Sequence, residues 1–383
     1  MRILHVLSTL NIGSGIANFV LNYYREIINY DIQFDFLVFQ KMPNDYYDEV
    51  VKLGARVFYI EKPTLNVAKY KKKLQRFFAE HVKEWEIVHI HEILVQKYVS
   101  KSAKKYGAVK KIIIHSHAAQ FVLPISGVSA FKNRVLMGVK KVRNAYLLSG
   151  LEKNGDYFFA CSLDAGRALF SGKALAGNSF YIAKNSIGTE RYRFNDDVRN
   201  KYRAELGIAG KKAIALIGRL CAEKNQFFFL DVFKKIIERD NSYRLLLIGD
   251  GELKAAIIKN IEELEISDKV TLTGNREDVA ELLSASDLFV LPSVREGLGM
   301  VLIEAQAAGL PCVRSDGVPD EAVITPYVKT IALKDDANIW AEEILTMPLE
   351  RYDGSTYVFD AKYDIQRNAE DLAEKYREIV GQI

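Results

Sequence analysis

Short apolar segments alternate with stretches of helical apolar spacing along most of the 383-residue chain. In the first half, this pattern predicts strands at residues 3–7, 34–39, 56–60, 87–90 and 109–115, and helices at 16–28 and 46–53. Strands that alternate with helices are typical of βαβ units, which build a parallel, doubly wound sheet.

The alternation begins again in the second half, which indicates a second domain of the same class. Strands are predicted at 213–217, 244–248, 270–273, 288–291 and 311–314, and helices at 225–239, from about 252, at 278–285 and at 300–308. We therefore predict an α/β fold of two Rossmann-like, doubly wound domains that face each other across a cleft. The expected boundaries are residues 1–183 and 184–361, and a last helix within 362–383 is expected to return to the first domain.

Composition indicates a globular protein of the reducing cytoplasm. Apolar residues make up 49% of the chain and charged residues 27%, which argues against disorder. The cysteines, Cys161, Cys221 and Cys312, lie far apart and form no CxxC pair, so neither a disulfide framework nor a structural zinc site is expected. No apolar run approaches the roughly 18 residues of a membrane span, and the apolar N-terminus is too short for a signal peptide.

The net charge of +4 hides an uneven distribution. Residues 1–183 contain 26 Lys and Arg against 14 Asp and Glu, whereas residues 184–383 contain 27 against 35. The first half is therefore basic and the second acidic. Either the halves meet different partners or their surface compositions have simply drifted, and both interpretations stay open.

The first candidate site is the turn Asn11-Ile12-Gly13-Ser14-Gly15, which follows the first predicted strand. Glycines let the backbone approach a phosphate, and the helix start behind them favours an anion. As a dinucleotide site the turn is incomplete, because Asn18 replaces the third glycine and the second strand ends in Gln40-Lys41 without a carboxylate for the ribose. We therefore do not expect NAD(P).

The most specific motif spans residues 293–305. A predicted strand leads into a turn with Glu296, Gly297, Leu298 and Gly299, and an apolar helix that contains Glu304 begins directly afterwards. Backbone N–H groups at the helix start would point at a ligand, and two carboxylates beside it would accept hydrogen bonds from sugar hydroxyls. A capped core helix with one solvated glutamate would explain either carboxylate alone, but it explains the full arrangement less well.

A second motif, Gly218 to Asn225, follows the first strand of the second half. Arg219 and Lys224 lie five residues apart across a strand-to-helix turn, where two cations could hold one diphosphate. The alternative is a pair of solvated surface cations, and this segment alone does not decide between the two.

With these residues in view, the chain resembles the bacterial retaining glycosyltransferases of family 4, which have the GT-B fold, and among them the exopolysaccharide and capsule enzymes most. The resemblance covers nearly the whole chain, and the Glu296–Glu304 spacing is its most specific part. The matching segments are residues 11–15, 115–117, 218–225, 249–252, 296–304, 316–321 and the closing helix.

The resemblance implies a role for each matching residue. Arg219 and Lys224 would hold the donor diphosphate, Glu304 the donor ribose, and Glu296 the hydroxyls of the transferred sugar. The backbone of Gly297, Leu298 and Gly299 would line sugar and phosphate, Gly13, Ser14 and Gly15 would close on the diphosphate from the other domain, and His117 would lie over the sugar. Ser14 departs from the family, where this position is often glycine, so its hydroxymethyl group would either crowd the phosphate or bond to it.

Two His-x-His pairs, His89/His91 and His115/His117, are candidate metal ligands. Residues i and i+2 of a strand share a face, so each pair could chelate an ion, and Glu92 is close in sequence. Because each pair ends an apolar strand, where the cleft of a doubly wound sheet lies, we favour a metal-free reading. The chain also lacks the Asp-x-Asp motif of Mg-dependent sugar transferases, so no metal or other cofactor is expected.

The resulting hypothesis is a retaining glycosyltransferase that moves a sugar from a nucleotide-diphosphate sugar, most simply a UDP-sugar, to a hydroxyl of a growing cell-surface glycan. The resemblance implies that this acceptor is lipid-linked. Two alternatives stay open: a UDP-sugar 2-epimerase on the same fold, for which we find no clear set of acid/base carboxylates in the first domain, and a non-catalytic sugar-nucleotide binding protein.

Basic residues cluster in the first half and suggest a peripheral contact with the anionic inner face of the plasma membrane. Apolar residues are mixed with cations over residues 121–137. Nucleic acid is not expected as a partner, because no base-stacking aromatics are interleaved with the cations. The clusters comprise Lys69, Lys71, Lys72, Lys73 and Arg76, then Lys101, Lys104, Lys105, Lys110 and Lys111, and finally Lys132, Arg134, Lys140, Lys141 and Arg143.

Overall fold

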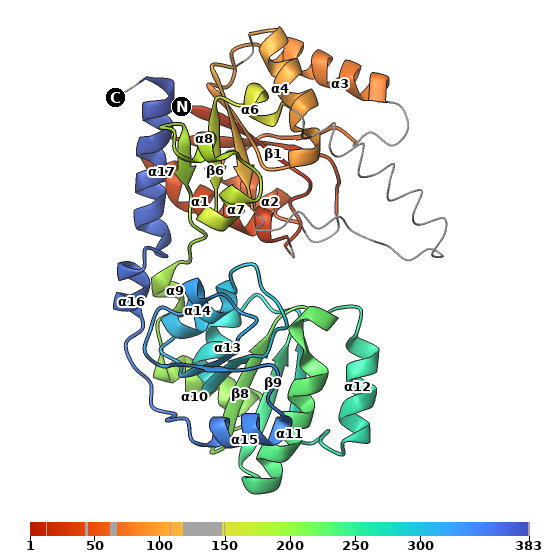
Figure 1. Ribbon diagram of the computed structural model, residues 1–383, viewed down its shortest axis with the longest axis vertical. Helices are drawn as coiled ribbons and strands as arrows, with labels where there is room; N and C mark the ends of the chain where they lie inside the picture. Colours follow the sequence, from red (N-terminus) through yellow and green to blue (C-terminus); the bar gives the residue numbers. More distant parts are fainter. Residues whose placement is uncertain are drawn as a thin grey trace. The chain divides into compact units, whose positions relative to one another are not determined.

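The computed structural model describes residues 1–381 except 13, 43–44, 62–66, 108, 118–147 and 149. The chain divides into two compact units (Figure 1). Unit 1 contains residues 1–186 and 365–383, and unit 2 contains residues 187–364. The first division therefore lies three residues after the predicted boundary, and the last helix belongs to unit 1.

Unit 1 is built on a parallel sheet of seven strands in the order β3-β2-β1-β4-β5-β6-β7. The five predicted strands are confirmed, whereas β6 and β7, of four and three residues, were not predicted. The strands are β1 Arg2–Leu7, β2 Gln33–Val38, β3 Val57–Tyr59, β4 Ile87–Ile90, β5 Lys111–Ser116, β6 Tyr157–Ala160 and β7 Phe180–Ile182.

Helices cover both faces of this sheet. Helices α1 and α17 pack together with one apolar cluster, and α3 and α4 pack with the other. In α17 the buried residues recur every three or four positions, from Ile365 to Ile379, so one stripe of the helix faces the core. The helices are α1 Gly15–Ile27, α2 Tyr47–Lys52, α3 Val67–Glu80, α4 Gln96–Lys105, α6 Leu151–Asn154, α7 Leu163–Arg167, α8 Gly172–Leu175 and α17 Ile365–Val380.

Unit 2 is built on a parallel sheet of six strands in the order β10-β9-β8-β11-β12-β13. Five of them were predicted, and β13, a half-exposed edge strand, was not. The strands are β8 Lys212–Ile217, β9 Tyr243–Ile248, β10 Val270–Gly274, β11 Leu288–Leu291, β12 Cys312–Ser315 and β13 Val328–Ile331. The helices are α9 Thr189–Tyr192, α10 Asp196–Glu205, α11 Gln226–Arg239, α12 Lys254–Glu263, α13 Val279–Ala285, α14 Met300–Ala307, α15 Ala337–Leu345 and α16 Ser355–Asp360.

Both sheets therefore have the doubly wound strand order, which confirms the predicted class of two Rossmann-like domains. The order reverses between the first and fourth strands of each unit, at β1/β4 in unit 1 and at β8/β11 in unit 2. In open parallel sheets, ligands bind beyond the carboxyl ends of the strands at such a reversal. The candidate site residues are therefore expected at the carboxyl edges of the two sheets, next to these reversals of strand order.

Candidate functional site

The loops after four neighbouring strands of unit 2 interlock at the carboxyl edge of its sheet. A Cβ atom added to Gly249 would lie 2.1 Å from the carbonyl oxygen of Gly218, and one added to Gly317 would lie 2.3 Å from that of Val294. Only glycine fits at both positions, because no side-chain atom tolerates such distances. The contacts hold the ends of β8, β9, β11 and β12 together around the reversal point.

The two motifs of the second half meet through an ion pair at this edge. Lys224 Nζ contacts Glu296 Oε1, and the Ser293 hydroxyl donates to the same oxygen at 2.8 Å. The backbone adds a second link, since Val294 N–H donates to the Glu223 carbonyl at 2.8 Å. The side chains of Lys224 and Glu296 are only 19% and 11% exposed, so both charges lie largely out of water.

Arg219 has a different carboxylate partner. Its side chain is 71% exposed and pairs with Glu252, from the loop after β9, at 3.0 Å. The structure thus pairs the two predicted cations with two different carboxylates. Because an exposed ion pair contributes only about 0–1 kcal/mol, Arg219 can exchange Glu252 for another anion at little cost.

The turn before α14 leaves a helix start open to a ligand. Gly299 is the N-cap residue and has a left-handed backbone with φ of 86°, which glycine adopts without strain. In the described structure no side chain caps this end of α14. Gly297 is exposed and Leu298 half-buried, so the turn reaches the surface. An uncapped helix start offers its N–H groups to an anion.

Glu304, two turns into α14, is half-buried. Burial raises the pKa of its carboxyl to about 7, and a hydrogen bond with the Tyr192 side chain opposes this rise. Tyr192 ends α9, and sequence reasoning missed it. Nothing in the local pattern around Tyr192 signals a contact with a residue more than a hundred positions away.

In unit 1 the predicted glycine turn is only partly described, because Gly13 lies outside the described residues. Ser14 is the N-cap residue of α1, and its hydroxyl accepts a hydrogen bond from the Ala17 N–H at 3.3 Å. Gly15 opens the helix, and a Cβ atom there would meet nothing within 4 Å. The hydroxyl of Ser14 therefore has a helix-capping role.

Five histidines gather on one face of the sheet of unit 1, at the ends of β1, β4 and β5. The predicted pairs do share a face: ring centroids are 4.4 Å apart for His89/His91 and 4.0 Å for His115/His117. His5 was missed, although a histidine inside the apolar first strand was a usable signal. It pairs in register with His89.

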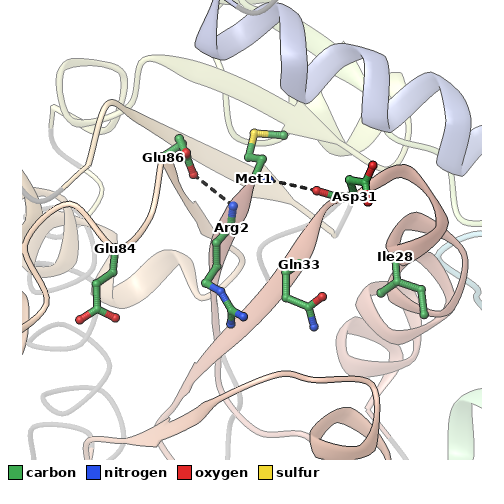
Figure 2. Close-up of a pocket in the computed structure, with 7 residues that line it drawn as sticks. All are labelled: Met1, Arg2, Ile28, Asp31, Gln33, Glu84 and Glu86. Carbon is green, nitrogen blue, oxygen red and sulfur yellow. Dashed lines mark hydrogen bonds between the residues drawn. The ribbon is translucent and has the colours of Figure 1, made fainter.

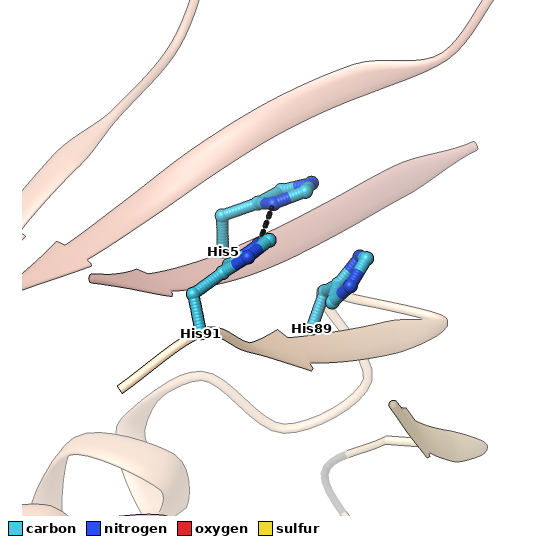
Figure 3. A group of neighbouring side chains, drawn as sticks. All are labelled: His5, His89 and His91. Atoms are coloured by element: carbon cyan, nitrogen blue, oxygen red, sulfur yellow. Dashed lines mark hydrogen bonds between the residues drawn. The ribbon is translucent and has the colours of Figure 1, made fainter. Parts of the chain in front are cut away.

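Two overlapping groups of these rings have nitrogens within 4.8 Å of one another: His5/His89/His91, which Figure 3 shows, and His91/His115/His117. Glu92 belongs to neither group, contrary to its suggested part in a metal site. Burial lowers the pKa of His5 and of His117 to about 3, and it lowers the pKa of the other three rings well below the ordinary value.

A hollow of about 480 Å³ lies at the opposite, amino edge of the same sheet (Figure 2). Its walls are tied together locally, with Met1 N donating to the Asp31 carbonyl at 2.9 Å and Arg2 N to Glu86 Oε2 at 3.1 Å. None of the predicted site residues lines it, and it lies at the wrong end of the strands for the ligand site of this fold. The lining residues are Met1, Arg2, Ile28, Asp31, Gln33, Glu84 and Glu86.

Similarity to known proteins decides the family. The chain is 30% identical over 348 residues to EpsF of Bacillus subtilis, which is named as a glycosyltransferase; the match covers 90% of this chain and 86% of EpsF. The chain belongs to the group 1 glycosyltransferase family. The model of that family, "Glycosyl transferases group 1", matches residues 198–347. This range contains every candidate site residue of unit 2.

One further relative and one solved structure are similar to this glycosyltransferase. It is 38% identical over 104 residues to a UDP-Gal:alpha-D-GlcNAc-diphosphoundecaprenol alpha-1,3-galactosyltransferase of Escherichia coli, covering 26% of this chain and 27% of the relative. The crystal structure of HepE of Anabaena in complex with UDP superposes with a TM-score of 0.73 at 15% identity, covering 99% of this chain and 100% of that one. The latter likeness supports the GT-B fold.

The basic surface of this glycosyltransferase is described in part. Lys69, Lys71, Lys72, Lys73 and Arg76 are exposed on α3, and Lys101, Lys104 and Lys105 are exposed on α4, which packs against α3. The predicted apolar segment 121–137 and the cations at 132, 134, 140, 141 and 143 lie outside the described residues. Over the described ranges, no helix has the length and apolar character needed to cross a membrane.

Proposed function

We propose that the enzyme transfers a sugar from a nucleotide-diphosphate sugar to a hydroxyl of a growing cell-surface glycan, with retention of configuration, as in family 4. The observation that carries the proposal is the ion pair of Lys224 and Glu296 beside the uncapped start of α14. A UDP-sugar is the donor we favour, since HepE has been solved with UDP and with UDP-glucose. The E. coli relative is likewise named for UDP-Gal.

Lys224 can hold Glu296 and a phosphate at the same time. Its ammonium group has three N–H donors, and one contact with Glu296 leaves two for the donor diphosphate. Arg219 would exchange Glu252 for the same diphosphate, and the backbone N–H groups at Gly299 would add the field of the helix start. Together these groups favour the charge that develops on the leaving diphosphate.

The carboxylates would bind the sugar and the ribose. Glu296 Oε1 accepts from Lys224 and Ser293, while its Oε2 has no partner in the described part of the chain and can accept a hydroxyl of the transferred sugar. Glu304 would accept the ribose hydroxyls. As the resemblance to family 4 implies, the turn at Gly13–Gly15 would bind the diphosphate and His117 the transferred sugar.

The reaction we propose takes place on one face of the donor sugar. The bond between the anomeric carbon and the diphosphate oxygen breaks, and a bond from the same carbon to the acceptor oxygen forms. The acceptor's proton passes to the leaving diphosphate. This chain supplies the charge and the orientation for the step, and no carboxylate is assigned as a covalent nucleophile.

We expect transfer without a metal ion. Lys224, Arg219 and the start of α14 supply positive charge where a metal-dependent transferase would hold Mg²⁺ on the diphosphate. Six of the ring nitrogens of the five clustered histidines contact one another in pairs at hydrogen-bond distances, which engages these nitrogens without an ion.

For the acceptor we favour a lipid-linked glycan taken at the inner face of the plasma membrane, with the protein otherwise in the cytoplasm. Two observations support this choice. The E. coli relative is named for a diphosphoundecaprenol-linked sugar, and α3 and α4 expose a run of cations. Each cation near an anionic bilayer contributes about 1 kcal/mol of attraction at low salt.

The test is transfer by variants of the two cations, assayed with a panel of UDP-, GDP-, ADP- and dTDP-sugars and the release of nucleotide. Lys224→Ala should lower transfer by roughly 100-fold or more, since its charge acts on the leaving group. Arg219→Ala should do likewise, and its exposed ion pair makes loss of folding unexpected. Lys254→Ala is a matched control, because Lys254 forms an exposed pair with Asp250 in the neighbouring loop.

Activity within a few-fold of wild type in both variants would refute the diphosphate site. Interconversion of a UDP-sugar without an acceptor would instead indicate the 2-epimerase, and donor binding with no turnover of any sugar would indicate a binding protein.

A further inference from the structure

The five buried histidines of unit 1 form two stacked rows. In the upper row, His5 Nδ1 lies 2.9 Å from His91 Nε2, and His91 Nδ1 lies 2.7 Å from His117 Nε2. Figure 3 shows the first of these contacts. In the lower row, Tyr376 Oη lies 2.8 Å from His89 Nδ1, and His89 Nε2 lies 3.0 Å from His115 Nδ1. Each contact has the length of a hydrogen bond.

Counting protons in the upper row leaves two arrangements. A neutral imidazole carries one N–H, so three rings bring three donors to two contacts, and one N–H is left at an end of the row. His91 has a single N–H and can donate to only one of its two neighbours. Each ring therefore donates to the next ring in the same direction along the row. The spare N–H is then either at His5 Nε2 or at His117 Nδ1.

The surroundings of the two ends of the row decide which end carries the spare N–H. His5 Nε2 is buried without a hydrogen-bond partner in the described structure, and the His5 ring packs on Phe34 with centroids 4.0 Å apart. His117, at the other end, is a half-buried residue, and its Nδ1 is not a buried atom that lacks a partner in the described structure. Buried N–H groups without a partner are rarer in proteins than unpartnered acceptors, so the spare N–H belongs at His117 Nδ1.

We propose that His5 and His91 are positioning residues that hold His117 as a neutral imidazole with its proton on Nδ1. This inference rests on the proposed function, in which His117 lies at the transferred sugar. His117 then offers the substrate a hydrogen-bond donor, because its Nε2 lone pair is occupied by the His91 N–H. It donates to an oxygen of the sugar and does not act as the base that deprotonates the acceptor.

Two further observations support the neutral row. In the described chain, no hydrogen bond or ion pair joins any of the five rings to a carboxylate, so nothing compensates a buried positive charge there. Burial accordingly lowers the pKa of His117 to about 3. A metal ion would need nitrogens converging on one point, whereas these nitrogens are directed at each other in pairs.

The first test is the tautomer itself, observed by long-range ¹H–¹⁵N correlation NMR on histidine-labelled protein without substrate. The chain has six histidines, and His81, which lies beside Glu84 and outside the rows, is the internal reference. We expect His117 to show a protonated Nδ1 and a bare Nε2. A protonated Nε2 on His117, or one equivalent of bound metal in the purified protein, would overturn the proposal.

The second test uses two substitutions of His91. Asn places an amide N–H where His91 has Nδ1 and can still donate to His117 Nε2, whereas Leu cannot. His91→Leu should free the His117 tautomer in the NMR spectrum and lower kcat about tenfold with little change in the donor KM, since one oriented hydrogen bond corresponds to roughly that factor. His91→Asn should keep the Nδ1–H tautomer and stay within about threefold of wild type.

Equal kcat values for the Leu and Asn variants, with both folded by thermal melting, would overturn the positioning role. If the Leu variant fails to fold, the wild-type spectrum and the Asn variant still decide the question. The tautomer measurement needs no turnover. Failure of the proposed transferase activity, with the expected spectrum intact, is therefore distinguishable from failure of this inference.

Discussion

Replacing Glu304 by glutamine should make the stability of unit 2 less dependent on pH. Burial raises the pKa of this carboxyl from an ordinary value of 4.5 to about 7. The folded chain therefore binds more protons than the unfolded chain between these two values. The resulting stabilisation is fully present below pH 4.5 and is lost as the pH rises through 7. A glutamine cannot ionise, so the free energy of unfolding of the variant does not include this pH-dependent loss.

The size of the effect follows from the two pKa values. The linkage relation gives the wild-type side chain a loss of at most about 2.5 kcal/mol between pH 5 and pH 8. Glu304 is half-buried, so solvent screening reduces this loss to roughly 1–2.5 kcal/mol. The free energy of unfolding of Glu304→Gln, taken relative to wild type, should thus increase by about 1–2.5 kcal/mol over the same interval.

Urea unfolding monitored by tryptophan fluorescence can measure this difference. The chain has two tryptophans, Trp85 in unit 1 and Trp340 in unit 2, both buried. In a Trp85→Phe background the signal reports on unit 2. Glu190→Gln is the matched control, because this carboxylate belongs to α9, the helix that Glu304 contacts through Tyr192, but is 76% exposed. If the free energies of unfolding of wild type and Glu304→Gln differ by the same amount at pH 5 and at pH 8, the raised pKa of Glu304 is refuted.

Three further predictions concern the metal, the loop and the membrane. Transfer should survive dialysis against EDTA, and complete loss that Mg²⁺ or Mn²⁺ restores would contradict our account of the diphosphate site. Gly317→Ala should lower both the melting temperature and transfer, because the new Cβ would meet the Val294 carbonyl oxygen; a variant equal to wild type in both would show that the loops are not interlocked. Anionic vesicles should sediment the enzyme at low salt, less so near 0.5 M salt and less when Lys71–Lys73 become Ser; equal recovery in the supernatant with anionic and neutral vesicles would refute membrane docking.

The sequence predicted the core of the fold because its signals are local. Buried parallel strands appear as apolar runs, and the turns at 218–225 and 296–304 combine glycine with charge directly after such runs. Strands β7 and β13, edge strands of three and four mostly half-exposed residues, were not predicted, although β3, an equally short edge strand, was. Local patterns place the elements well, but they do not show which side chains meet.

In the candidate site, too, the sequence indicated individual residues but not the contacts between them. Lys224 and Glu296 were each chosen from their own motif, yet only the strand order, with β8 beside β11, brings them into contact. Tyr192 was missed because its partner lies far along the chain, whereas His5 was missed although a histidine inside the apolar first strand was a usable local signal. Periodicity carries no information about a contact between α9 and α14, or about a row of rings assembled from three strands.

The return of the last helix to unit 1 has a consequence for synthesis on the ribosome. Unit 2 is one uninterrupted stretch, residues 187–364, and all of it is available before α17 leaves the exit tunnel. Translation of unit 1 begins first, yet this unit stays incomplete until α17 has been translated, because α17 supplies an apolar stripe and Tyr376, the partner of His89. We therefore expect unit 2 to complete its folding before unit 1, although translation of unit 1 begins first. Until α17 is available, the apolar face of unit 1 that it covers is exposed and is a target for chaperones.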